Sequence, residues 1–166
     1  LNCTSLKSID GISVLDGLQV VKLEGCKSVR NIDGLKGLKR LQKLGLGDCP
    51  ELQNLDALNE SDLLDRVILN DCPRLQRLDG IKELKFLEHL VLKNCPKVQN
   101  INELKGLISL ELLALEGCTE LQNVDGLKSL TELGELSLRG STSLSKETIE
   151  ELRKALPKTK IIGPNE

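Results

Sequence analysis

Six cysteines are the residues of this 166-residue chain with the most chemistry available to them, and their spacing limits what they can do. Zinc sites need convergent ligands at close spacings such as Cys-x₂-Cys. Here every cysteine occupies the same place in a 23-residue period, and Ser141 takes the next place. We therefore expect a ladder of buried thiols that act as small apolar groups and weak donors, with no metal site. The ladder comprises Cys3, Cys26, Cys49, Cys72, Cys95 and Cys118.

His89 is the only histidine, and the sequence around it offers little for catalysis. A general base needs a nucleophile and an orienting partner nearby. The segment "LEHLVLKNC" contains no Ser, Thr or Tyr, and the lone Gly-x-Gly of "LGLGDC" lacks the third glycine and the helix of a dinucleotide site. We predict that His89 is a surface contact and that the chain is not an enzyme and binds no cofactor.

The elements that position these residues follow from the repeat itself. Each unit reads L-x-x-L-x-L-x-x-C-x-x-L-x-x-L-D-G-L-x-x-L-x-x, with Val and Ile as substitutes. Alternation before the cysteine favours a short strand, and spacing by three after it favours turns or 3₁₀ helix. A single unit is too small to bury its own leucines, so successive units must stack, with strands about 4.8 Å apart in a parallel sheet.

Two local features of the repeat invite interpretation. The Asp-Gly pairs beginning at Asp10, Asp33, Asp79 and Asp125 predict short turns capped by the aspartate, with the glycine at a positive φ. After Cys49 the pattern changes, with Ala57 in place of Gly and Ser61 in place of Leu. For this departure we expect a local bulge or a tolerated polar swap on the convex side, in preference to a second binding site.

The block L-x-x-L-x-L-x-x-C-x-x-L resembles the leucine-rich repeat superfamily over residues 1 to about 144. The tail "LDGLKxLxxL" is similar to repeats of the protein phosphatase-1 regulatory subunit and the internalins, although this unit is one residue longer and has Cys where they usually have Asn. The Cys form is also similar to repeats of plant TIR-type immune receptors and kinetoplastid proteins. The resemblance implies an α/β repeat fold: a curved, right-handed leucine-rich repeat solenoid that binds proteins, commonly through the concave parallel β-sheet, with turns and 3₁₀ segments on the convex face.

The ends of the chain divide it into two expected parts. Residues 1–144 hold about six repeats, the first truncated, and residues 145–166 form a C-terminal cap. In the cap, Ile149, Leu152 and Leu156 share one helix face after a possible cap residue, Ser145 or Thr148, and a final strand follows at 160–162. Because the chain begins at Leu1 inside a strand block, we expect upstream repeats or a cap in the parent protein, and in this chain an uncapped N-terminal edge open to self-association.

Composition excludes several classes of partner and points to a compartment. The formal charge of −2 gives no field that would recruit nucleic acid or an anionic membrane, and no apolar run approaches the roughly 18 residues that span a bilayer. Unpaired thiols favour the reducing cytoplasm. The sequons at Asn2 and Asn59 argue more weakly for an extracellular location. Phe86 is the only aromatic residue, so an interface must rely on Arg, aliphatic and polar groups.

Strand alternation predicts which side chains face the concave surface. Aliphatic residues rimmed by polar ones often mark an interface, although β-propensity alone also selects Ile and Val on strands. The predicted partner-binding residues are Arg66, Ile68, Asn70, His89, Val91, Lys93, Leu112, Ala114 and Glu116.

The resulting functional prediction is a protein-protein interaction module within a larger intracellular protein, with an immune-type receptor as the leading case. A regulatory subunit of an enzyme such as a phosphatase is one alternative. A substrate adaptor in a ubiquitin ligase is another. The three differ in the domains that surround the repeat, which the repeat itself does not reveal.

Overall fold

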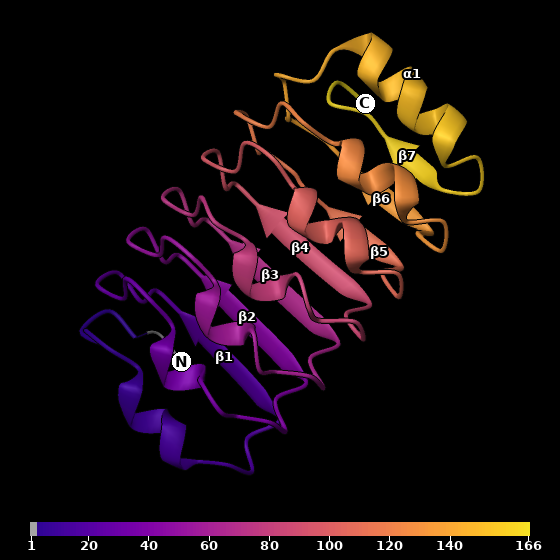
Figure 1. Ribbon diagram of the computed structural model, residues 1–166. Helices are drawn as coiled ribbons and strands as arrows, with labels where there is room; N and C mark the ends of the chain where they lie inside the picture. The colour runs from indigo at the N-terminus through magenta and orange to yellow at the C-terminus, as the bar shows by residue number, and fades with distance from the viewer. Residues whose placement is uncertain (1–2) are drawn as a thin grey trace.

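The computed structural model describes residues 3–166 as one curved stack of repeats (Figure 1). Over these residues a single parallel sheet of seven strands follows chain order, so each strand pairs with the next. The strands are β1 (Val20–Glu24), β2 (Lys43–Gly47), β3 (Arg66–Asn70), β4 (His89–Lys93), β5 (Leu112–Ala114), β6 (Glu135–Ser137) and β7 (Lys160–Ile162).

The pairing register of the sheet follows the sequence period. Arg66 lies opposite Lys43 on one side and His89 on the other, and each is displaced by one 23-residue unit. Within β3, Val67 and Leu69 are buried while Arg66, Ile68 and Asn70 are half-buried. The alternation predicted from L-x-L is therefore confirmed: one face of the sheet packs on the core and the other faces solvent.

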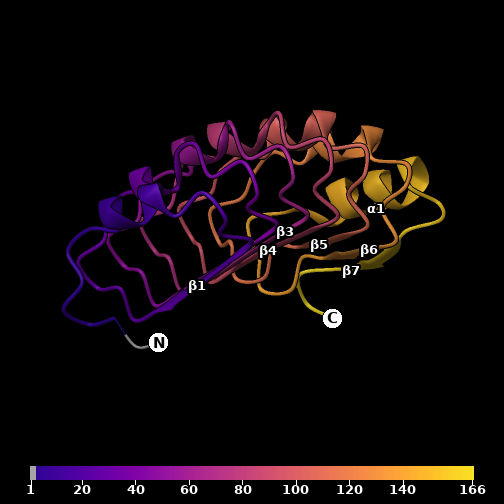
Figure 2. The same ribbon diagram turned by 90° about the horizontal axis from the view of Figure 1, so that it is seen from below.

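Short 3₁₀ turns line the opposite side of the core (Figure 2). In this side view, with the repeats running from left to right, the turns form an upper arc and the strands form the layer beneath it. Leucines from turns and strands meet between these layers and are almost fully buried in the interior repeats. The turns are Asp10–Val14, Asp33–Leu35, Asp56–Leu58, Asp79–Ile81, Asn102–Gly106 and Asp125–Ser129.

The interpretation of the Asp-Gly pairs was wrong in both of its parts. The aspartate does not cap the turn: the Asp33 N–H donates to Asn31 Oδ1 at 3.1 Å, and the Asp125 N–H donates to Asn123 Oδ1 at 2.9 Å. The glycine is needed for close stacking, because a Cβ on Gly80 would lie 1.8 Å from the Leu55 carbonyl oxygen of the preceding turn. Positive φ angles occur instead at Gly37 and directly before Cys26, the four later cysteines and Ser141, at Gly25, Asp48, Asp71, Asn94, Gly117 and Gly140.

The irregular unit after Cys49 also differs from expectation. Its strands pair without a break in register, so neither β2 nor β3 carries a bulge in the described structure. Ser61 is 1% exposed and occupies the core position held by Leu38 and Leu84 in the neighbouring units. Its Oγ has no hydrogen-bond partner among the described residues. The polar swap therefore lies in the core and not on the convex surface, where it weakens packing locally.

The C-terminal segment folds as a helix followed by a strand. Helix α1 (Lys146–Ala155) begins after Ser145, whose side chain accepts a hydrogen bond from the Thr148 N–H at 3.2 Å. Its buried face contains Ile149 and Leu152, and the helix ends two residues before Pro157. Strand β7 then pairs with β6 and covers the last repeat, which fits the role of a cap.

Candidate functional site

The predicted partner-binding residues lie together on the inner face of β3, β4 and β5. Arg66, His89 and Leu112 are adjacent across the sheet, as are Ile68, Val91 and Ala114. Asn70 pairs with Lys93 at the ends of β3 and β4. Because β5 ends at Ala114, Glu116 lies just beyond it in a turn. We call these nine residues the concave patch.

The centre of the concave patch is a shallow hollow of about 200 Å³. It is lined by Arg66, Ile68, His89, Val91 and Leu112, which come from three successive strands. The aliphatic side chains there are half-buried by one another, since the sheet curves inward. Arg66 Nε is buried and makes no hydrogen bond within the described residues, so the guanidinium would have to move before this N–H could reach a partner's acceptor.

The rim of the concave patch is already partly paired. Lys93 Nζ lies 3.7 Å from a Glu116 carboxylate oxygen, and the Ser137 hydroxyl donates to the other oxygen at 2.8 Å. Ser137 is itself buried, although strand alternation places it on the solvent face. A partner that contacts this end must compete with the Lys93–Glu116 pair, which is exposed and weak.

A second hollow of about 260 Å³ adjoins the patch over β2, where glycines replace side chains. The Lys22 side chain passes 3.6 Å from the place where a Gly45 Cβ would be, and the Glu24 carboxylate lies over Gly47. Ile68 and Asn70 form the far wall. The concave surface is therefore deeper over β2 than over β3.

The cysteines occupy equivalent core positions, with the thiols directed to backbone carbonyls. Cys26, Cys49, Cys72, Cys95 and Cys118 are buried free thiols. Cys118 Sγ approaches the Leu92 carbonyl oxygen at 3.6 Å, and Ser141 Oγ donates to the equivalent Leu115 oxygen at 2.6 Å. Burial raises the pKa of the Cys118 thiol to about 11, so the thiol is neutral at physiological pH.

Other features of the described residues give no sign of a reactive centre. Among residues 3–166, no group of three or more His, Cys, Asp and Glu side chains is arranged to hold a metal ion. His89 lies among apolar groups and Arg66, none of which is a nucleophile. Within the same range, no helix is long and apolar enough to cross a membrane. Asn59 is exposed, whereas Asn2 lies outside the described residues.

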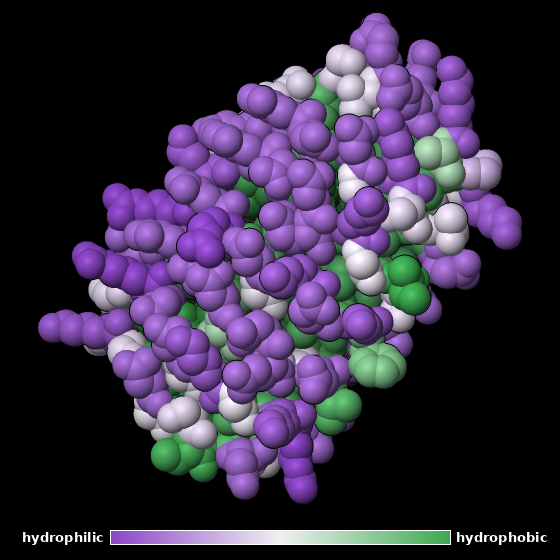
Figure 3. All heavy atoms as spheres, in the orientation of Figure 1, coloured by the Kyte–Doolittle hydropathy of each residue, from purple (hydrophilic) through white to green (hydrophobic). Residues whose placement is uncertain are grey.

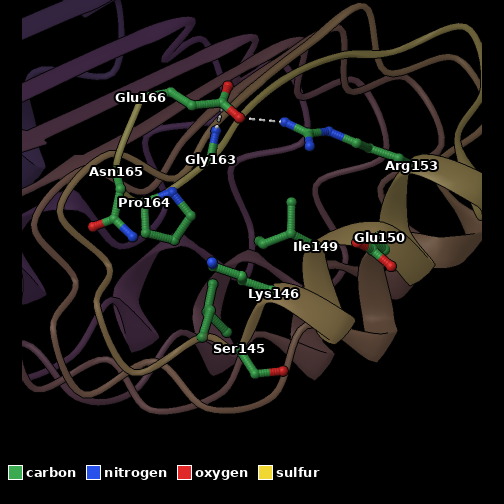
Figure 4. Close-up of a pocket in the computed structure, with 10 residues that line it drawn as sticks. Ser145, Lys146, Ile149, Glu150, Arg153, Gly163, Pro164, Asn165 and Glu166 are labelled. Atoms are coloured by element: carbon green, nitrogen blue, oxygen red, sulfur yellow. Dashed lines mark hydrogen bonds and ion pairs between the residues drawn. The ribbon is translucent and has the colours of Figure 1, made fainter.

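The C-terminal cap contains a further hollow, of about 250 Å³, between α1 and the last residues (Figure 4). The Arg153 guanidinium pairs with the Glu166 carboxylate across its mouth. This bond and a hydrogen bond from the Gly163 N–H hold the pKa of the Glu166 carboxyl below its ordinary value. The one hydroxyl among the labelled lining residues, on Ser145, accepts the Thr148 N–H at the helix start, so the hollow is explained by the packing of the cap.

Sequence reasoning missed a second group of exposed apolar side chains. Leu63, Phe86 and Ile108 are all at least half exposed and lie just before β3, β4 and β5. The signal was present in the repeat alignment, because the equivalent positions of other units hold Arg40, Ser109 and Lys39. A large apolar residue in a column that is otherwise polar is informative where an isolated exposed one is not.

Comparison with known families accounts for the repeat. The sequence model described as the BspA type leucine-rich repeat region matches residues 1–111 and 87–159 in six copies. The chain belongs to this leucine-rich repeat family. The predicted superfamily is thereby confirmed, and the BspA type is a finer description than the sequence analysis reached. No protein of curated function matches the chain in sequence.

Solved structures confirm the fold class of this leucine-rich repeat chain. The internalin inlF of Listeria monocytogenes is 20% identical, with a TM-score of 0.68 over 95% of this chain and 50% of its own. Internalin C2 of the same organism is 19% identical, with a TM-score of 0.64 over 95% of this chain and 82% of its own. The repeat domain of the type III effector XopL is 21% identical, with a TM-score of 0.62 over 93% of this chain and 63% of its own. The chain thus spans half the length of inlF, and the likeness establishes the solenoid fold alone.

Proposed function

We propose that this leucine-rich repeat chain is a protein-interaction module that binds its partner on the concave patch. The observation that carries the proposal is the continuous set of half-buried aliphatic side chains on three adjacent strands, rimmed by polar groups. Covering such a surface removes apolar area from water at about 25 cal/mol per Å². The Arg66 side chain lines the same hollow and adds direction, because its charged guanidinium can donate hydrogen bonds to a partner's acceptor.

The side chains around His89 favour a role in binding over a role in catalysis. The side chains that line its hollow supply a cation and aliphatic groups, and neither a nucleophile nor a second acid or base. We therefore assign His89 to partner contact, where its ring combines an apolar body with hydrogen-bonding nitrogens.

We infer further that the module works inside a larger intracellular protein, with an immune-type receptor as the leading case. The five buried free thiols support a reducing compartment, where a structural cysteine ladder is not drawn into disulfides.

The test is affinity capture from the source lysate with the intact chain and two double variants. Ile68→Asp with Val91→Asp places two charges in the concave patch. Gln76→Asp with Gln122→Asp adds the same charge at exposed positions away from it. Circular dichroism first establishes that all three proteins are folded.

We expect the intact chain and the control to retain the partner and the concave variant to lose it. The affinity of the concave variant should fall about 100-fold, because the two new carboxylates would lose their hydration when the partner covers them. Equal capture by all three proteins would refute the concave site. Turnover of any substrate that disappears on His89→Ala would refute the binding-only assignment.

A further inference from the structure

Three apolar side chains form a row along the edge of the sheet where the central strands begin. Leu63 is 50% exposed, Phe86 is 64% exposed and Ile108 is 65% exposed, and they precede β3, β4 and β5 in turn. Figure 3 shows green spheres set among purple ones along the edge from which the strands of Figure 1 start. We call these three residues the edge row. It is separate from the concave patch, whose side chains lie on the strands themselves.

The fold does not require apolar residues at these places, and the repeats themselves provide the comparison. Positions equivalent to Leu63 and Phe86 hold Gly17, Arg40, Ser109 and Glu132 in the other units. Positions equivalent to Ile108 hold Asp16, Lys39, Asp62, Lys85 and Thr131. Because polar residues serve equally well in the same local structure, packing does not explain the edge row.

The charges beside Phe86 and Ile108 are mostly acidic, whereas the unit before Leu63 carries Lys39 and Arg40. Asp65, Glu88 and Glu111 occupy one column directly before the strands, and Asp62 and Glu132 lie beside them. Within residues 3–166 none of these five carboxylates forms an ion pair. In the four segments that precede β3 to β6, which are residues 62–65, 85–88, 108–111 and 131–134, Lys85 is the one cation. Some carboxylates elsewhere are paired between adjacent repeats, as Glu51 is with Arg74 and Glu120 is with Lys97, although others are not.

Apolar and acidic side chains also line one hollow at this edge of the sheet. A hollow of about 560 Å³ lies between the starts of β4, β5 and β6. The side chain of Ile108 forms its apolar wall, and the carboxylates of Glu88, Glu111 and Glu132 surround it. No cation lines it within the described part of the chain. A space of this kind is complementary to a Lys or Arg head group whose methylenes lie against an aliphatic wall.

We propose that the edge row docks a segment of a partner protein that carries basic residues next to large apolar ones. The apolar side chains of the segment cover Leu63, Phe86 and Ile108. Its cations lie among the five carboxylates, with a guanidinium or ammonium group on the Phe86 ring as a further contact. The inference goes beyond the concave patch, because it concerns a different surface and names the chemistry of what binds there.

The experiment selects binders from a random 12-residue peptide library displayed on phage, with the full chain as bait. The affinity of a selected, labelled peptide is then measured by fluorescence polarisation. Two edge variants are used, Phe86→Ser and the pair Glu88→Gln with Glu111→Gln. The charge-matched control is Glu83→Gln with Glu103→Gln, which changes carboxylates near the 3₁₀ turns. The concave double variant serves as the control for the other surface.

We expect the selected peptides to be enriched in Lys and Arg beside Leu, Phe or Trp. We also expect each edge variant to weaken binding about 10-fold or more, and a rise in salt to weaken it further. The charge-matched control and the concave variant should stay within about twofold of the intact chain.

Peptides without basic residues would overturn the proposal, as would affinities unchanged by the edge variants. Loss of binding in the concave variant alone would show that the peptide binds the concave patch and not the edge row. Sedimentation of the chain alone at several concentrations completes the test: self-association that Phe86→Ser abolishes would replace the partner segment with a second copy of the chain.

Discussion

The first repeat and the interior repeats have nearly the same sequence pattern and very different burial. Leu15 is 50% exposed, whereas Leu38, its equivalent in the next unit, is fully buried. A Cβ on Gly11 would meet nothing within 4 Å, whereas on the equivalent Gly34 it would lie 2.0 Å from the Ile9 carbonyl oxygen. The difference arises because each turn is covered by the preceding one, and within residues 3–166 no turn precedes the first.

This contrast shows that the residue types determine the shape of a repeat and that the neighbours determine its stability. In a stack of this kind, each interior unit gains contact energy from both sides and a terminal unit from one side. Equivalent substitutions should therefore have unequal effects. Their difference measures the stacking energy directly, since the local structure is the same in both units.

The largest effect is expected for leucine truncation in the interior. Leu38→Ala should lower the free energy of unfolding by about 3 kcal/mol, because the cavity lies in a closed core. Leu15→Ala should cost less than about 1 kcal/mol, since that side chain is already half exposed. Urea unfolding followed by circular dichroism measures both. Equal losses would show that the first repeat is packed as tightly as the second.

A second pair tests the close stacking of the turns. Gly80→Ala should destabilise the chain by about 2 kcal/mol, because the added Cβ collides with the Leu55 carbonyl group and forces two turns apart. Gly11→Ala has no such contact and should be neutral or slightly stabilising. Thermal unfolding of the two variants side by side gives the result. A mild effect at Gly80 would mean that the turns can move apart to accept a Cβ, as Ala57 is accepted at the equivalent position of the preceding unit.

The 23-residue period was sufficient to predict the parallel sheet and the 3₁₀ turns. These depend on a pattern that is repeated several times, so a single ambiguous residue carries little weight. The concave patch was also placed on the correct face, because strand alternation fixes side-chain direction. The role of the concave patch in binding stays a prediction, because contacts within the chain do not reveal a partner.

Features that depend on contacts between units could not be predicted in the same way. The Asp-Gly pair reads as a cap and a turn within one unit, and only stacking reveals that the glycine at position 80 makes room for the carbonyl of Leu55. Ser61 reads as a surface substitution until its equivalent leucines are seen in the core. The exposure of Phe86 likewise depends on the loop geometry between two rungs.

The smallest expected effect concerns pH and the interior thiols. The pKa of Cys118 is about 11 in the folded chain against an ordinary value of 9.0, so folding favours the neutral thiol. This contribution to stability is complete below pH 9 and is lost as the pH rises from 9 towards 11, because the unfolded thiol ionises first. Cys118→Ser keeps a donor to the Leu92 carbonyl, as Ser141 does for Leu115, and removes the titration. Urea midpoints at pH 8 and pH 10.5 should fall less in the variant than in the unaltered chain. An identical fall would show that the Cys118 thiol contributes nothing measurable to the loss of stability at alkaline pH.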